Sequence, residues 1–167
     1  MMLKKEIFEI HAVNENFNTL IERFPNIHTG NKIILLPADE ERHLFYNGTL
    51  EIFQYLSTKF DENTVNILGD DDSYRELSLH SKAHWVGVFM ISSILAPIFT
   101  NVVSDYINNE LHAEPKDEIA LTIKVVKKNN STTSIDYRGN SENLDKVFKE
   151  VNKLSETNES DKTINTK

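Results

Sequence analysis

Residues 84–103, HWVGVFMISSILAPIFTNVV, contain no Asp, Glu, Lys or Arg, and no other feature of the chain restricts its fold as strongly. The run from Trp85 to Val103 has 19 residues, which is long enough for a helix that crosses a bilayer. A segment of this kind either enters a membrane or is buried inside a protein.

Pro97 divides this apolar run into two parts. Proline disfavours helical geometry in the residue before it, and it fits the first turn of a new helix. The sequence therefore predicts two short helices, at about 82–95 and 97–112, which together form an apolar two-helix element at about 82–112.

The two parts differ in how apolar side chains are spread around them. After Pro97, apolar residues recur at helical spacing and polar residues cover the opposite side, which suits water better than lipid. Before Pro97 the segment is apolar on every side, but it is too short to span a bilayer. We therefore expect a buried element in a soluble protein, and the alternative is a peripheral membrane protein that inserts residues 85–103.

The rest of the chain alternates between strand-like and helix-like patterns. The segments predicted as strands are 5–13, 33–36, 64–68, 74–80, 117–128 and 134–139, and those predicted as helices are 14–24, 49–60 and 140–154. This order predicts an α/β (or α+β) fold: a mixed β-sheet with packed helices and a C-terminal β-hairpin plus helix.

The domain organisation follows from length and from where periodicity ends. At 167 residues the chain is long enough for one domain with a core. We expect a single domain over 1–154, with 1–80 and 81–154 as alternative halves around one core. The polar segment 155–167 lacks an apolar stripe and is predicted to be a disordered tail.

Composition argues against several classes of function. The formal net charge is −8, which repels phosphate backbones, so no nucleic-acid partner is expected. The chain has no cysteine, which excludes disulfides and Cys-based metal sites. No glycine-rich nucleotide-binding motif is present, and no cofactor is expected. The N-terminus lacks the apolar run of a signal peptide, so the expected location is the cytoplasm.

One group of residues resembles a hydrolytic site. Asp39 and His43 follow the strand at 33–36, and Asp70, Asp71 and Asp72 follow the strand at 64–68. If those strands are parallel neighbours, the carboxylates and the imidazole meet at one sheet edge, where they would suit a divalent metal or acid–base work. Solvated turns are the simpler interpretation.

His80 and His84 stand four residues apart, a spacing that on a helix can hold a metal ion. His80 is predicted to end a strand, which breaks that geometry, and no Glu lies between the two as in the HExxH motif. We therefore assign no metal site. Basic residues cluster on the predicted hairpin and would suit an acidic partner or a phosphate, although protection of an edge strand is the simpler interpretation; they are Lys124, Lys127, Lys128 and Arg138.

The apolar element also supplies the candidate interface. A helix that is apolar on all sides must be covered, and in a small chain a second subunit can cover it. We expect self-association or a protein partner, through the residues Trp85, Phe89, Ile98, Phe99, Val102 and Tyr106.

Residues 95–151 show a further pattern. LAPIFTNVVSDYI is followed by IALTIKVV, a short turn and IDYRGNSENLDKVFKEV. With Pro97 and the Tyr137 to Gly139 segment, this part resembles small uncharacterised proteins of bacterial multi-gene loci, some of them defence-type loci. The resemblance implies an accessory subunit with a larger partner, for instance in antiviral defence, and implies no catalytic residues.

These observations rank three functions. The first is a non-catalytic accessory subunit of a bacterial multi-protein system that acts through protein–protein contacts. The second is a metal-dependent hydrolase or nuclease that uses the Asp and His cluster. The third is the peripheral membrane protein.

Overall fold

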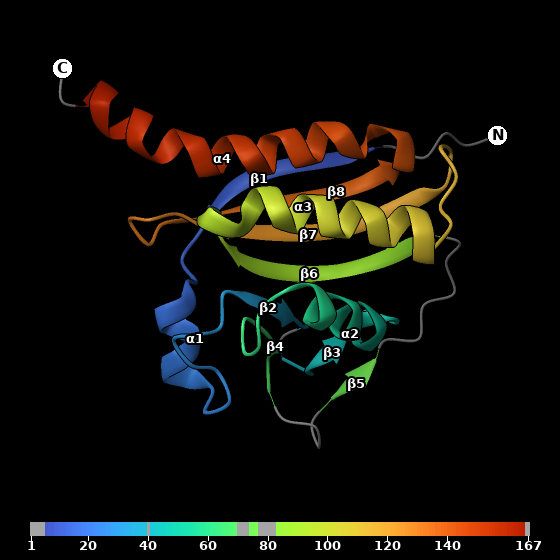
Figure 1. The fold of residues 1–167 in the computed structure, drawn as a ribbon, viewed down its shortest axis with the longest axis horizontal. Coiled ribbons are helices and arrows are strands. Elements are labelled where there is room, and N and C mark those ends of the chain that lie inside the picture. Colours follow the sequence, from blue (N-terminus) through green and yellow to red (C-terminus); the bar gives the residue numbers. More distant parts are fainter. Residues whose placement is uncertain (1–5, 40, 70–73, 77–82, 166–167) are drawn as a thin grey trace.

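The computed structural model describes residues 6–39, 41–69, 74–76 and 83–165, with side chains described as far as Glu156. A six-stranded sheet with the strand order β1-β8-β7-β6-β2-β4 runs through its centre (Figure 1). The strands are β1 (Ile7–Val13), β2 (Ile33–Leu36), β4 (Val65–Ile67), β6 (His84–Ser92), β7 (Glu118–Val126) and β8 (Thr132–Asn140). A separate parallel pair consists of β3 (Leu44–Phe45) and β5 (Arg75–Glu76).

The sheet is mixed, as the sequence predicts. β6 runs parallel to β7 and β2 runs parallel to β4, whereas the other neighbours are antiparallel. The middle of the sheet consists of β8, β7 and β6 from 81–154, and strands from 1–80 lie on both sides of it, because β1 pairs with β8 and β2 pairs with β6. The alternative halves therefore both contribute to one sheet.

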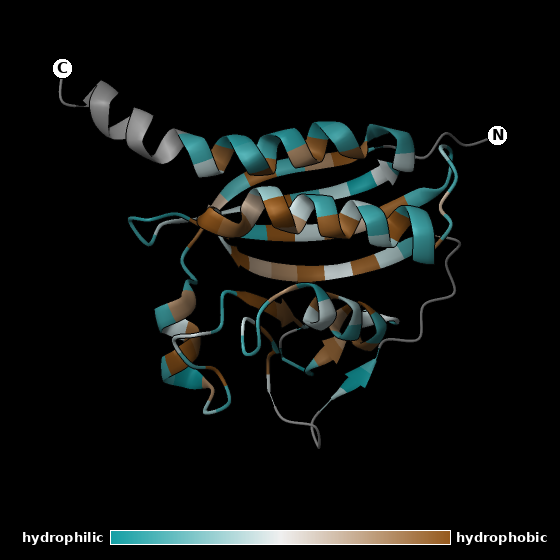
Figure 2. Cartoon of the chain, in the orientation of Figure 1, coloured by the Kyte–Doolittle hydropathy of each residue, from teal (hydrophilic) through white to brown (hydrophobic). Residues whose placement is uncertain are grey.

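Helices cover the two faces unequally (Figure 1). Three of them pack on one face and enclose the larger core: α2 (Thr49–Lys59), α3 (Ala96–Asp105) and α4 (Leu144–Asn165). The short helix α1 (Phe17–Arg23) packs on the opposite face, where Leu20 meets Ile34 and Met90. On that face Glu9 and His11 of β1 are exposed. The central strands are the most apolar part of the ribbon in Figure 2.

Residues 84–92 form the strand β6, so the prediction of a helix at 82–95 is wrong. β6 lies in the middle of the sheet between β7 and β2, and Val86 to Ile91 are all buried. A strand that is covered on both faces is apolar at consecutive positions, which hides the alternation that identifies a half-buried strand. The predicted two-helix element is therefore a strand followed by a helix.

The break at Pro97 and the helix after it are confirmed. A 3-10 turn, η2 (Ser93–Leu95), follows β6, and Pro97 lies in the first turn of α3. The helix continues as a π-helical turn, η3 (Tyr106–Glu110), so helical structure covers most of the predicted 97–112. In the part of the chain that the structure describes, no helix is long and apolar enough to cross a membrane.

Three further predictions are confirmed by the structure. β7 and β8 form the hairpin, with Ile119, Leu121 and Ile123 buried on its inner face. α2 begins at Thr49, and Gly48 provides its N-cap at φ 92°, a conformation that suits glycine. At the C-terminus, α4 begins at Leu144 but continues to Asn165, and so overlaps the segment 155–167 for which the sequence predicts disorder.

Candidate functional site

Asp39, the first residue of the predicted hydrolytic cluster, is engaged by a neighbouring arginine. Its carboxylate accepts hydrogen bonds from the backbone N–H of Arg42 at 3.1 Å and from Arg42 Nε at 2.8 Å. These bonds lower the pKa of Asp39, and the side-chain bond is the largest cause. A carboxylate held in this way stays ionised with its charge already compensated, which makes it a poor general acid.

His43 lies in the same turn with its ring directed at an aromatic neighbour. Its backbone has φ 54°, and its ring meets Phe24 edge to face with centroids 6.4 Å apart. Its Nδ1 is buried without a hydrogen bond among the described residues. Asp70, Asp71 and Asp72 lie outside the described residues, so the hydrolytic cluster stays a prediction.

His84 takes part in a loop contact. Its Nε2 lies 3.4 Å from Asp117 Oδ2, and the same carboxylate oxygen accepts the backbone N–H of Glu114 at 2.8 Å. The backbone bond from Glu114 is the largest cause of a lowered Asp117 pKa, and His84 adds to it. His80 lies outside the described residues. Within the described ranges, no group of three or more His, Asp or Glu side chains is arranged to hold a metal ion.

The predicted interface residues separate into a buried and an accessible set. Phe89 and Phe99 have no exposed surface and pack in the chain's own core, where their ring centroids are 5.2 Å apart. Tyr106 is 7% exposed and its ring meets Tyr55 at 5.1 Å. Val102 is half-buried. Ile98 is 53% exposed and is the predicted residue that lies most clearly at the surface.

Ile94 extends this apolar surface, and the sequence prediction missed it. It is 71% exposed on η2, four residues before Ile98. Its four-residue spacing from Ile98 was a usable signal, but the prediction of a helix buried on all sides concealed it. We call Ile94 and Ile98, with the half-buried Leu95 and Val102 beside them, the corner patch.

Trp85 faces the other side of the sheet, where it joins a second cluster. Its ring contacts that of Tyr46 at a tilt of 38° with the centroids 4.8 Å apart, and the guanidinium of Arg138 lies 4.8 Å from the Trp85 ring centroid. Together with Thr122 and Asp136 these residues line a cleft of about 220 Å³. The pKa of Tyr46 is raised mainly by burial and then by the charge of Asp136, while Arg138 opposes the shift.

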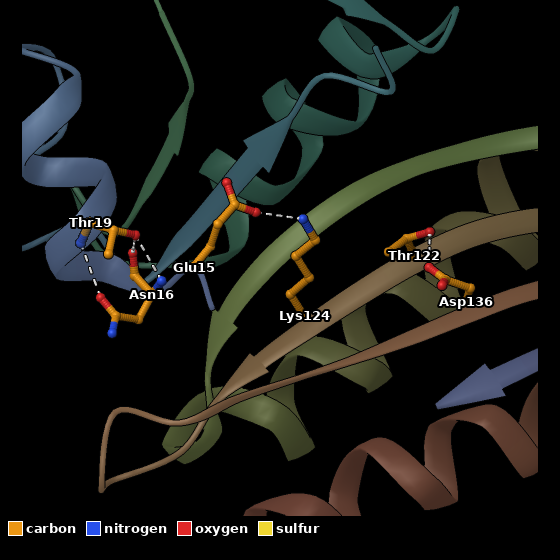
Figure 3. Close-up of polar contacts among 6 residues, drawn as sticks. All are labelled: Glu15, Asn16, Thr19, Thr122, Lys124 and Asp136. Carbon is orange, nitrogen blue, oxygen red and sulfur yellow. Dashed lines mark hydrogen bonds and ion pairs between the residues drawn. The ribbon is translucent and has the colours of Figure 1, made fainter. Parts of the chain in front are cut away.

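The basic and acidic groups of this face are matched to each other. Lys124 Nζ donates to Glu15 Oε1 at 2.8 Å, and Thr122 Oγ1 donates to Asp136 Oδ1 at 2.8 Å (Figure 3). Arg138 Nε donates to Glu118 Oε1 at 2.8 Å. Because Lys124 and Arg138 are paired with carboxylates, this face offers little net positive charge to a phosphate or an acidic partner.

A second concave region lies between α2 and η3. It has a volume of about 620 Å³ and is lined in part by Tyr55, Tyr106, Glu51 and Glu110. Burial raises the pKa of the Tyr106 hydroxyl, and the charges of Glu51 and Glu110 raise it further. The raised pKa keeps the tyrosine protonated at neutral pH, so its hydroxyl can donate a hydrogen bond.

Comparisons with protein-family models, with curated proteins and with solved structures found no match for this chain. The functional argument therefore starts from the surfaces that its own residues form.

Proposed function

We propose that the protein is a non-catalytic accessory subunit that binds a larger protein partner through the corner patch. The observation that carries this proposal is the exposure of two neighbouring isoleucines, 71% for Ile94 and 53% for Ile98. They are exposed on a chain whose formal net charge is −8. Adjacent exposed apolar side chains with a polar surrounding are a common feature of protein-binding surfaces.

The backbone under the corner patch is well supported. Ala96 and Phe99 have no exposed surface and anchor the first turns of α3 in the core. Thr100 Oγ1 donates to the carbonyl of Pro97 at 3.1 Å and accepts from Asn152 Nδ2 of α4 at 3.3 Å. A surface that is already ordered loses little conformational entropy on binding, which favours its use as a docking site.

The nature of the partner is proposed from the sequence resemblance. Leu95, Ile98 and Val102 of the corner patch belong to residues 95–151, the part that resembles accessory proteins of bacterial multi-gene loci, and Ile94 directly precedes it. A neighbouring gene product with an apolar groove is therefore the proposed occupant, and antiviral defence is the proposed setting. Burial of the surface that Ile94 and Ile98 still expose contributes about 2–4 kcal/mol to such an interface before the costs of association.

The test is a binding measurement with matched variants. The protein is co-expressed with each neighbouring gene product, and any complex is purified and its affinity measured by calorimetry. Ile98→Glu is expected to weaken binding by about 30-fold or more, because a buried carboxylate replaces an apolar contact. Leu50→Glu is the matched control, since Leu50 is 43% exposed on α2, away from the corner patch.

Three outcomes would overturn the proposal. Equal loss of affinity in both variants would place the interface elsewhere. Retention of full affinity in Ile98→Glu would remove the corner patch from the interface. Sedimentation of the wild type with anionic phospholipid vesicles, lost in Ile98→Glu, would instead favour the peripheral membrane function.

A further inference from the structure

The strand β1 lies at one edge of the six-stranded sheet with a free side. Among the described residues its only strand neighbour is β8, with which it pairs without interruption from Ile7↔Arg138 to Val13↔Thr132. A free edge presents unpaired backbone N–H and C=O groups, which can pair with a strand of another chain.

This edge has few of the usual protective features. Ile7–Val13, IFEIHAV, contains neither proline nor lysine, and its register with β8 has no bulge. The opposite edge differs, because β4 has only three residues. Natural sheets usually protect a long edge strand with lysine or other charged residues, proline or a bulge, and over its seven residues β1 offers only the charge of Glu9, which suggests that the edge is covered in use.

The side chains of β1 point to the same conclusion. Ile7 is 41% exposed and Ile10 is 48% exposed. α4 packs on β8 and β7, and so leaves Ile10 at the border of the larger core. On the opposite face, the Cα partner of Glu9 in β8 is Asp136, a second carboxylate, and Asp136 Oδ2 also lies 3.6 Å from Nδ1 of His11 in the same chain. Like charges in directly opposed positions are unfavourable, so Glu9 would gain from a cation on its other side.

The sequence of β1 is complementary to itself in one antiparallel register. In an antiparallel pair, directly opposed residues place their side chains on the same face of the sheet. If the helices of both copies also lie on one side of the joined sheet, the two-fold axis must therefore pass between two equivalent copies of one β1 residue. An axis at Ile10 places Glu9 opposite His11 of the second copy, and Ile10 opposite its own equivalent. An axis at Glu9 or at His11 would instead oppose two identical polar side chains.

We propose that two copies of this chain associate through antiparallel β1 strands around a two-fold axis at Ile10, which joins their sheets into one. The backbone hydrogen bonds supply the affinity, and the Glu9–His11 pairs, one on each side of the axis, select the register. This interface is separate from the corner patch, so a dimer could still present two corner patches to a larger partner.

Disulfide trapping tests the register directly, because the chain contains no cysteine. Directly opposed residues in an antiparallel pair have Cα atoms roughly 4.5–5.5 Å apart, within the roughly 4.4–6.8 Å that a disulfide requires. Ile10→Cys is therefore expected to form a covalent dimer on mild oxidation. Ala12→Cys is the control on the same face, because its two copies would be offset by roughly 13 Å along the strands.

A charge exchange gives an independent measurement. In sedimentation equilibrium, Glu9→Lys is expected to weaken the dimer by about tenfold or more. The double variant Glu9→Lys/His11→Glu is expected to recover most of that loss, since it restores opposite charges in the same register. Ile98→Glu is expected to leave the dimer unchanged. Circular dichroism checks that each variant is folded.

Several results would overturn this proposal. A wild-type chain that is monomeric at about 100 µM would remove it. Equal trapping of Ile10→Cys and Ala12→Cys would indicate random collision. A dimer that is lost in Ile98→Glu but unaffected by Glu9→Lys would place the contact at the corner patch.

Discussion

The rings of Phe89 and Phe99 meet at an angle of 68° with their centroids 5.2 Å apart. Phe89 belongs to β6 and Phe99 to α3, so two parts of one uncharged segment fold back on each other around the turn before Pro97. This contact is why the most apolar part of the chain is buried within the chain itself.

Removal of this ring contact is expected to lower the stability of the fold. Phe99→Ala should lower the free energy of unfolding by about 3–5 kcal/mol, because it leaves a cavity at a site with no exposed surface. Ile98→Ala, on the neighbouring exposed position, should lower it by less than about 1 kcal/mol. Urea unfolding measures both. Similar losses in the two variants would contradict the burial of Phe99.

β6 has a bulge between Trp85 and Gly87, where its register with β7 shifts, and this bulge depends on the glycine. Gly87 has φ +151°, and a Cβ at this position would lie 2.9 Å from Cζ of Phe89. Gly87→Ala should therefore destabilise the fold by about 1–3 kcal/mol, through backbone strain and displacement of a core ring. Gly30→Ala is the control, since its Cβ would meet nothing closer than 3.5 Å. Thermal unfolding compares them, and an unchanged midpoint in Gly87→Ala would be inconsistent with this bulge.

Stability in acid is expected to depend on Asp117. Its pKa is lowered from the usual 3.8, chiefly by the backbone N–H of Glu114 and then by His84. A lowered folded-state pKa gives stability that is present above the unfolded value and is lost as pH falls through the folded value. Asp117→Asn should flatten the loss of stability below about pH 4. An unchanged slope in Asp117→Asn, measured by urea unfolding across the same pH series, would contradict this role of Asp117.

Stability in alkali is expected to depend on Tyr137. Burial, followed by the charge of Glu6, raises its pKa from 10.0 to about 12. The hydroxyl donates to the carbonyl of Asn140 at 2.8 Å, a bond that needs the proton. The stability that this raised pKa contributes is complete below about pH 10, and it is lost as pH rises through the folded-state pKa near 12. Ultraviolet titration should show one late-ionising tyrosine fewer in Tyr137→Phe, and an unchanged titration would contradict this assignment.

Much of the candidate site could not be found from the sequence. Trp85 and Arg138 are far apart in the chain, and only the pairing of β6 with β7 and of β7 with β8 brings the guanidinium over the indole ring. Tyr46 joins them from the loop after β3. Asp39 was correctly placed after β2, but the sequence did not indicate that Arg42 would engage it.

By itself the sequence determined the helices and strands that have one solvent-exposed and one buried side. The alternation from Ile119 to Val125 gave the hairpin, the apolar spacing after Gly48 gave α2, and Pro97 gave the start of α3. Only the tertiary structure decided that residues 84–92 are a strand. A segment that is buried on every side carries no periodic signal, so its conformation is selected by its neighbours, here the hydrogen-bonding edges of β7 and β2.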